Sequence, residues 1–109
     1  MNSSEDSFLD RIRSLVKRGA FKISSHAFDA LVDDDLARAD IDSLDTAEIV
    51  EFYPNFAKGP AILLLQRTVD NRVVHCVWGI PKGLDEPAVL VTAYIPDIDR
   101  WDRRFKERL

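Results

Sequence analysis

Cysteine is almost absent from this chain, and so are the patterns that depend on it. The single Cys76 excludes an internal disulfide, and neither histidine belongs to a Cys/His cluster with zinc spacing. The aspartate triplet at 33–35 lacks the glycine and the closing glutamate of a calcium loop. A metal held by His26 and His75 would need carboxylates from elsewhere, and no local motif supplies them. We therefore expect no metal and no other cofactor.

Long apolar runs and a targeting signal are missing as well. No run approaches the roughly 20 residues that a membrane helix needs. The N-terminus is polar and acidic, whereas a signal peptide begins with basic and then apolar residues. A length of 109 residues suits one domain, over 1–109. The expectation is a single-domain cytoplasmic protein without a membrane partner.

Positive charge is scarce and unevenly distributed. The chain has a net charge of −4, with twelve acidic and six basic residues in 1–51, and seven and nine in 52–109. The strongly basic surface of an obligate nucleic-acid binder is therefore missing. RNA that meets only the second half remains compatible with this distribution, and so does a charge that serves solubility alone.

Helical periodicity marks the first part of the chain. Acidic residues after Ser3 and an apolar stripe predict an amphipathic helix over 5–18, which Gly19 ends. Residues 21–23 alternate like a short edge strand, and a second helix is expected after the next serines. A short third helix is expected over 41–44. The side chains expected to be buried in the second helix are Phe28, Leu31 and Val32.

From residue 48 the apolar period changes to two, which predicts strands. Four strands are expected, over 49–53, 61–68, 73–80 and 88–96. They would form a mostly antiparallel sheet with two to three N-terminal helices packed on one face. The predicted fold class is therefore α+β. The basic tail 98–109 would be either a short helix docked by its aromatic side chains or a frayed end.

Alternation divides the strand residues between two faces. The set predicted to face the helices is Val50, Phe52, Val74, Cys76, Trp78, Ile80, Val89, Val91, Ala93 and Ile95. The opposite set is Glu51, Tyr53, Val73, His75, Val77, Leu90, Thr92 and Tyr94. The strand over 61–68 is apolar on both faces, so either Gln66 or Arg67 could join the polar side.

The polar face would combine a carboxylate, an imidazole and two phenols. Such groups can act on a phosphodiester, because one can deprotonate a 2′-hydroxyl, another can protonate the leaving oxygen, and a cation can stabilise the charged transition state. Half-exposed sheets also carry threonine and tyrosine for their strand propensity, so a purely structural interpretation stays open.

Two further residues are candidates. His26 follows a capping serine near a helix N-terminus, where a neutral imidazole is favoured as a base or hydrogen-bond acceptor. A local role, in which His26 orients the start of the helix, is equally compatible with that position. Lys82 lies in the loop 81–87 between the last two strands and would form the rim of a site.

Four short motifs resemble an uncharacterised family of small bacterial proteins, a domain of unknown function. The motifs are ISSHA at 23–27, EIVEFYP at 48–54, VHCV at 74–77 and VTAYIP at 91–96. The resemblance spans about 22–97 and implies a relation to RelE-like toxins, compact α+β ribonucleases of toxin–antitoxin pairs. It implies an RNA-cleaving or RNA-binding protein with a cognate antitoxin as partner. The site residues that it carries over are His26, Glu51, His75, Thr92 and Tyr94.

The ribonuclease hypothesis gives these residues roles in a metal-independent reaction. His26 or Glu51 would act as base, and His75 or Tyr94 as acid or orienting group. The substrate-binding residues would be Tyr53, Arg67, Lys82 and Thr92, with Arg67 as the cation.

One position departs from the family. Many relatives have an arginine four residues after the helix histidine, where this chain has Ala30. Arg67 or the basic tail could replace that guanidinium. The alternatives to a ribonuclease are a catalytically inactive protein-interaction module and a small-molecule binding protein that uses the same face.

Overall fold

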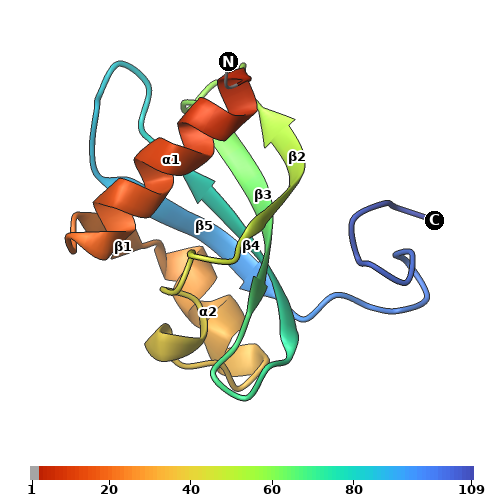
Figure 1. The fold of residues 1–109 in the computed structure, drawn as a ribbon. Helices are drawn as coiled ribbons and strands as arrows, with labels where there is room; N and C mark the ends of the chain where they lie inside the picture. Colours follow the sequence, from red (N-terminus) through yellow and green to blue (C-terminus); the bar gives the residue numbers. More distant parts are fainter. Residues whose placement is uncertain (1–2) are drawn as a thin grey trace.

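The computed structural model describes residues 3–109, which form two α-helices and one five-stranded sheet (Figure 1). The elements are α1 (Ser4–Lys17), β1 (Phe21–Ile23), α2 (Ser25–Asp33), the 3-10 helix η1 (Arg38–Asp40), β2 (Glu48–Tyr53), β3 (Ala61–Arg67), β4 (Val73–Gly79) and β5 (Ala88–Tyr94). The α+β class is therefore confirmed. The third helix expected over 41–44 was wrong, because Ile41 and Leu44 are buried side chains of an irregular connection that follows η1.

Both helices begin at a serine cap, as the sequence indicates. Ser3 Oγ accepts a hydrogen bond from the backbone N–H of Asp6 at 3.1 Å, and Ser24 Oγ accepts one from Ala27 at 3.0 Å. These bonds satisfy backbone donors that have no partner within the helix. Gly19 follows the end of α1 with a φ of 78°, a conformation that glycine adopts without steric cost.

The sheet has the strand order β1-β5-β4-β3-β2. Neighbouring strands from β2 to β5 are antiparallel, whereas β1 pairs with β5 in parallel. The prediction of a four-stranded, mostly antiparallel sheet was therefore incomplete, because β1 adds a fifth, parallel strand. The three residues of β1 suffice because Phe21 packs edge-on against Trp78, with ring centroids 5.7 Å apart, and so joins the core.

The core lies between the helices and one face of the sheet. Helix α1 runs across that face and packs on β2, β3 and β5, while α2 packs on β5 (Figure 1). One polar side chain is buried there: the Gln66 amide donates to the Ile41 carbonyl at 2.8 Å and accepts from Trp78 Nε1 at 2.9 Å. Of the two candidates on β3, Gln66 therefore faces the core and the exposed Arg67 lies on the other face.

Two register shifts correct the predicted faces of the strands. Between Val77 and Trp78 the pairing with β5 skips Val91, so the alternation of β5 reverses at that point. Leu90 is fully buried in the core, whereas Val91 is 42% exposed and Val89 is partly exposed. The predictions for these three residues were wrong, and the prediction for Ala93 was right.

Four further side chains that were expected to face the core do not do so. In β2 the register shifts at Val50, so Ile49 packs against the core in its place. Ile95 is 37% exposed, just beyond the end of β5. In α2 the buried residues are Ala27 and Leu31, which lie one turn apart. Phe28 and Val32, expected in the core, are 59% and 63% exposed on the adjacent face of that helix.

Candidate functional site

Three strands bring four of the predicted site residues to the sheet face opposite α1. They are Glu51 and Tyr53 of β2, His75 of β4 and Tyr94 of β5, and together they form the polar cluster. The Tyr53 hydroxyl donates a short hydrogen bond to Glu51 Oε1. Across the β4–β5 pair, His75 lies opposite Tyr94, and the Tyr94 hydroxyl lies 3.3 Å from His75 Nδ1.

The C-terminal segment, residues 97–109, covers this cluster. Figure 1 shows the segment on the side of the sheet away from α1. Trp101 is 5% exposed and packs edge-on against His75, with ring centroids 4.5 Å apart. Of the two expectations for the tail, docking by an aromatic side chain is what the structure shows, although the segment forms no helix.

Both ring nitrogens of His75 are occupied. His75 Nε2 lies 2.6 Å from the carbonyl oxygen of Phe105, which can only accept, so Nε2 carries the proton. The Tyr94 hydroxyl then donates to Nδ1. With the C-terminal segment in place, His75 is fully buried and has no nitrogen free for a substrate.

The guanidinium beside the cluster comes from Arg108. Arg108 Nε and Nη2 donate to the two carboxylate oxygens of Glu51 at 3.2 and 3.0 Å, and the guanidinium lies 4.7 Å from the centre of the Trp101 ring. Lys106 adds an ion pair with Glu48 at 3.5 Å. The basic tail, rather than Arg67, thus places a cation at the carboxylate.

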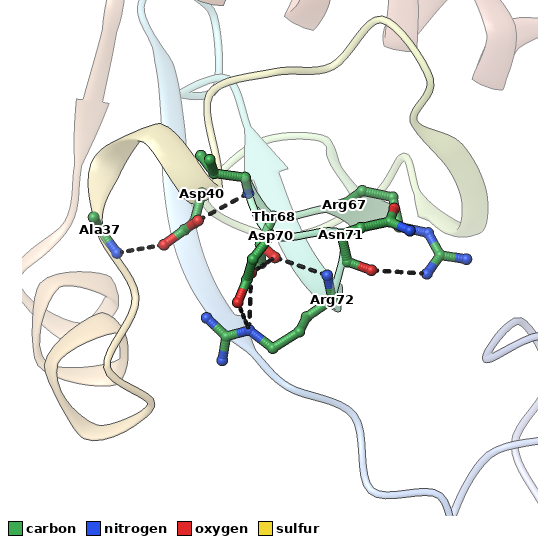
Figure 2. Close-up of polar contacts among 8 residues, drawn as sticks. Ala37, Asp40, Arg67, Thr68, Asp70, Asn71 and Arg72 are labelled. Carbon is green, nitrogen blue, oxygen red and sulfur yellow. Dashed lines mark hydrogen bonds and ion pairs between the residues drawn. The ribbon is translucent and has the colours of Figure 1, made fainter.

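Arg67 is held elsewhere, in a network around the β3–β4 turn (Figure 2). Its Nη1 donates to the Asn71 carbonyl at 3.4 Å. In the same turn, Arg72 pairs with Asp70, and the Asp70 carboxylate also accepts from the Thr68 hydroxyl (Figure 2). Asp40 of η1 accepts from the backbone N–H of Val69, which ties the turn to the core side of the molecule. This network fixes the turn, and Arg67 makes no contact with the polar cluster in it.

The electrostatics of the cluster follow from its contacts. Hydrogen bonding from Arg108 lowers the pKa of Glu51, and burial lowers the pKa of His75. Burial, together with the Glu51 carboxylate, raises the pKa of Tyr53 to about 12. Burial also raises the pKa of Tyr94. At neutral pH the cluster therefore holds one ionised carboxylate, a neutral imidazole and two protonated phenols.

His26 lies apart from the cluster, in a groove of about 740 Å³ at the other end of the same sheet face. The groove runs between the start of α2 and the loop 54–60, and the Tyr53 ring stacks on Phe56 beside it, 4.8 Å between centroids. The groove is lined by Ser24, Ser25, His26, Phe56, Ala57, Lys58, Gly59, Pro60, Ala61, Gly79, Ile80, Pro81, Val89 and Val91.

Thr92 and Lys82 belong neither to the polar cluster nor to the residues that line the groove. Thr92 is half-buried opposite Val77, and Lys82 is exposed in the β4–β5 loop. The backbone N–H of Lys82 donates to the Lys58 carbonyl at 2.9 Å, which joins its loop to the loop that borders the groove. The structure thus brings together Glu51, Tyr53, His75 and Tyr94, and leaves the other predicted residues separate.

A family comparison matches residues 23–95 to a domain of unknown function, DUF4258. This stretch covers more than half of the chain and includes the whole sheet except the first two residues of β1. The chain belongs to the DUF4258 family. None of the curated proteins and none of the solved structures compared with the chain matches it.

The region that matches DUF4258 includes the polar cluster but not the C-terminal segment that covers it. The polar cluster and the groove lie within 23–95, whereas Trp101, Phe105 and Arg108 lie outside it. The sequence did not identify Arg108 as a neighbour of Glu51, although the aromatic spacing of the tail made a docked segment one of its two interpretations. Among residues 3–109 no helix is long and apolar enough to span a membrane. The same residues contain no group of three His, Cys, Asp or Glu side chains able to hold a metal ion.

Proposed function

We propose that this DUF4258 protein is a RelE-like toxin of a bacterial toxin–antitoxin pair, an RNA-binding protein that cleaves RNA without a metal once the C-terminal segment leaves the cluster. The observation that carries the proposal is the polar cluster itself. Two phenols, a carboxylate and an imidazole from three strands meet on one sheet face. These are the groups that phosphodiester cleavage through a 2′-hydroxyl requires.

The reaction would follow from the chemistry of each group. Glu51 takes the proton of the 2′-hydroxyl, whose oxygen attacks phosphorus. The bond from phosphorus to the leaving 5′-oxygen breaks, and that oxygen receives a proton from His75. Because Arg108 leaves with the C-terminal segment, a cation from elsewhere, supplied by the chain or by the RNA-bound complex, balances the charge of the phosphorane. Tyr94, which lies 3.3 Å from Nδ1, keeps the imidazole in position.

The protonation state of His75 supports the idea that the docked C-terminal segment keeps the cluster inactive. Burial is the main cause of the lowered pKa of His75, so the covered imidazole is neutral. Its one ring proton, on Nε2, is held by the carbonyl oxygen of Phe105 and is not available to a leaving group. When Trp101 moves away, water reaches the ring and the pKa rises toward the range in which an imidazolium acts as acid near neutral pH. Displacement of the C-terminal segment would thus expose the cluster to RNA and also allow His75 to become protonated.

The proposal is tested with single-stranded RNA in EDTA. Three chains are compared: the natural sequence, Trp101→Ala, and Trp101→Ala combined with His75→Gln. Arg103→Ala, an exposed change in the same segment, is the matched control. We expect Trp101→Ala to cleave faster than the natural chain, and the added His75→Gln to lower that rate by about 100-fold. Absence of both binding and cleavage in all chains would refute the proposal.

A second candidate is a catalytically inactive interaction module. The observation that favours it is the satisfied state of the cluster, in which both His75 nitrogens and both Glu51 oxygens already have partners. This candidate predicts that the tagged chain retains a protein partner during purification and leaves RNA intact, including as Trp101→Ala. Cleavage by Trp101→Ala that depends on His75 would exclude it.

A further inference from the structure

The groove at the uncovered end of the sheet face has a shape that the strands themselves create. Its floor is formed by small or short side chains, Ala61 and Gly79 next to Val89 and Val91, so the sheet is hollowed there. Its volume of about 740 Å³ lies within the usual range of ligand sites. Unlike the polar cluster, this hollow is not covered by the C-terminal segment.

The charge of the groove differs from that of the rest of the chain. None of its fourteen lining residues is acidic, although 19 of the 109 residues of the chain are Asp or Glu. Lys58 and His26 line it, together with two serines. The acids of the neighbouring loop are engaged elsewhere, since Asp85 pairs with Arg11 of α1 and Glu86 pairs with Arg18, just after the end of that helix. An anionic ligand would therefore meet a cation and no carboxylate among the lining residues.

An aromatic ring is fixed at the edge of the groove. Phe56 is 53% exposed, and its ring lies parallel to Tyr53 within 2° at a centroid distance of 4.8 Å. Tyr53 covers one side of the Phe56 ring, so the exposed area belongs to the other side. The loop that carries Phe56 is held tightly: at Gly59 a side chain would come within 2.2 Å of the Ile80 carbonyl oxygen. A flat apolar surface is thus held in place before any ligand arrives.

We propose that this groove binds an unpaired nucleobase of single-stranded RNA, with the base stacked on Phe56 and an adjoining phosphate at Lys58. Stacking on a fixed aromatic ring beside a cation is how proteins hold single strands without reading their sequence. The inference rests on the proposed RNA-binding function and names the part of the RNA that is held. Tyr53 joins the two sites, because its ring supports Phe56 while its hydroxyl donates to Glu51.

Fluorescence anisotropy with a labelled single-stranded RNA octamer tests the stacking. Phe56→Ala should weaken binding about tenfold, and Phe56→Trp should restore it. The matched control is Phe28→Ala, which removes an equally exposed phenylalanine from α2 outside the groove and should leave the affinity unchanged. An abasic octamer should bind the natural chain as weakly as the normal octamer binds Phe56→Ala, with no further loss when the two changes are combined.

The outcomes separate this inference from the proposed function. If the natural chain binds RNA but Phe56→Ala, the abasic octamer or a duplex of the same sequence binds equally well, the groove inference is wrong and RNA binding stands. If no RNA binds, the proposed function fails, and the groove is tested by NMR titration with adenosine monophosphate. Shifts of the Val89 and Val91 methyl signals that disappear in Phe56→Ala would support the groove, and unchanged signals would overturn it.

Discussion

Removal of one tryptophan should uncover the polar cluster without unfolding the protein. Trp101 is 5% exposed and packs on His75, so Trp101→Ala should cost about 3 kcal/mol of the free energy that holds the C-terminal segment in place. The Arg108–Glu51 pair is half-exposed on the arginine side, at 59%, and contributes at most about 1 kcal/mol after solvent screening. Trp101 therefore holds the segment, and Arg108 orients it.

The pKa of His75 reports this change. Burial is the largest cause of its depression below 6.5, so uncovering the ring in Trp101→Ala should raise it. The Cε1 proton signal of His75 follows this pKa in an NMR titration.

The same shift makes stability depend on pH. Because the folded pKa of His75 is lowered, the unfolded chain binds more protons between that folded value and 6.5. The free energy of unfolding should therefore fall as the pH decreases from 6.5 toward the folded pKa, by at most about 1.4 kcal/mol per pH unit. In Trp101→Ala this dependence should weaken. An unchanged pKa of His75 in that variant, or an equal change in Arg103→Ala, would refute the reasoning.

Three further predictions concern packing and protonation. Gly59→Ala should lower the free energy of unfolding by more than about 2 kcal/mol in a denaturant titration, whereas Gly83→Ala, at a φ of 79° with open space around it, should cost about 1 kcal/mol. Gln66→Leu should cost about 1–3 kcal/mol in the same assay, because the buried Trp78 N–H loses its acceptor. An absorbance titration should assign a phenol of pKa about 12 to Tyr53, and Tyr53→Phe should remove that component.

Much of the fold follows from local patterns in the sequence. The serine caps, the apolar stripe of α1 and the period of two after residue 48 define both helices and the four strands from β2 to β5. The parallel pairing of β1 does not follow, because nothing within three residues specifies a partner 67 residues away. The faces of β5 do not follow either, since one unpaired residue, Val91, reverses the alternation and its position depends on the partner strand.

The candidate site divides in the same way. Alternation in β4 and the end of β5 correctly brings His75 and Tyr94 to one face, and β2 adds Glu51 and Tyr53. The position of Arg108 depends instead on the tertiary path of a segment without regular structure. Hydrophobic periodicity carries no information about such a path. The separation of His26 from the cluster has a related cause, because a single histidine at a helix start does not indicate which end of the sheet it will meet.

The groove is open and the polar cluster is covered, and this difference limits how RNA binding could lead to cleavage. RNA held only in the groove binds equally well whether the C-terminal segment is docked or displaced, because the segment does not cover the groove. A ligand with equal affinity for two states does not change their ratio, however tightly it binds. Phe56 contacts alone therefore cannot open the cluster. Opening requires a ligand that contacts the uncovered polar cluster, or a partner that holds Trp101 and Arg108 away from it. The binding free energy of that ligand or partner must exceed the free energy with which Trp101 holds the segment in place.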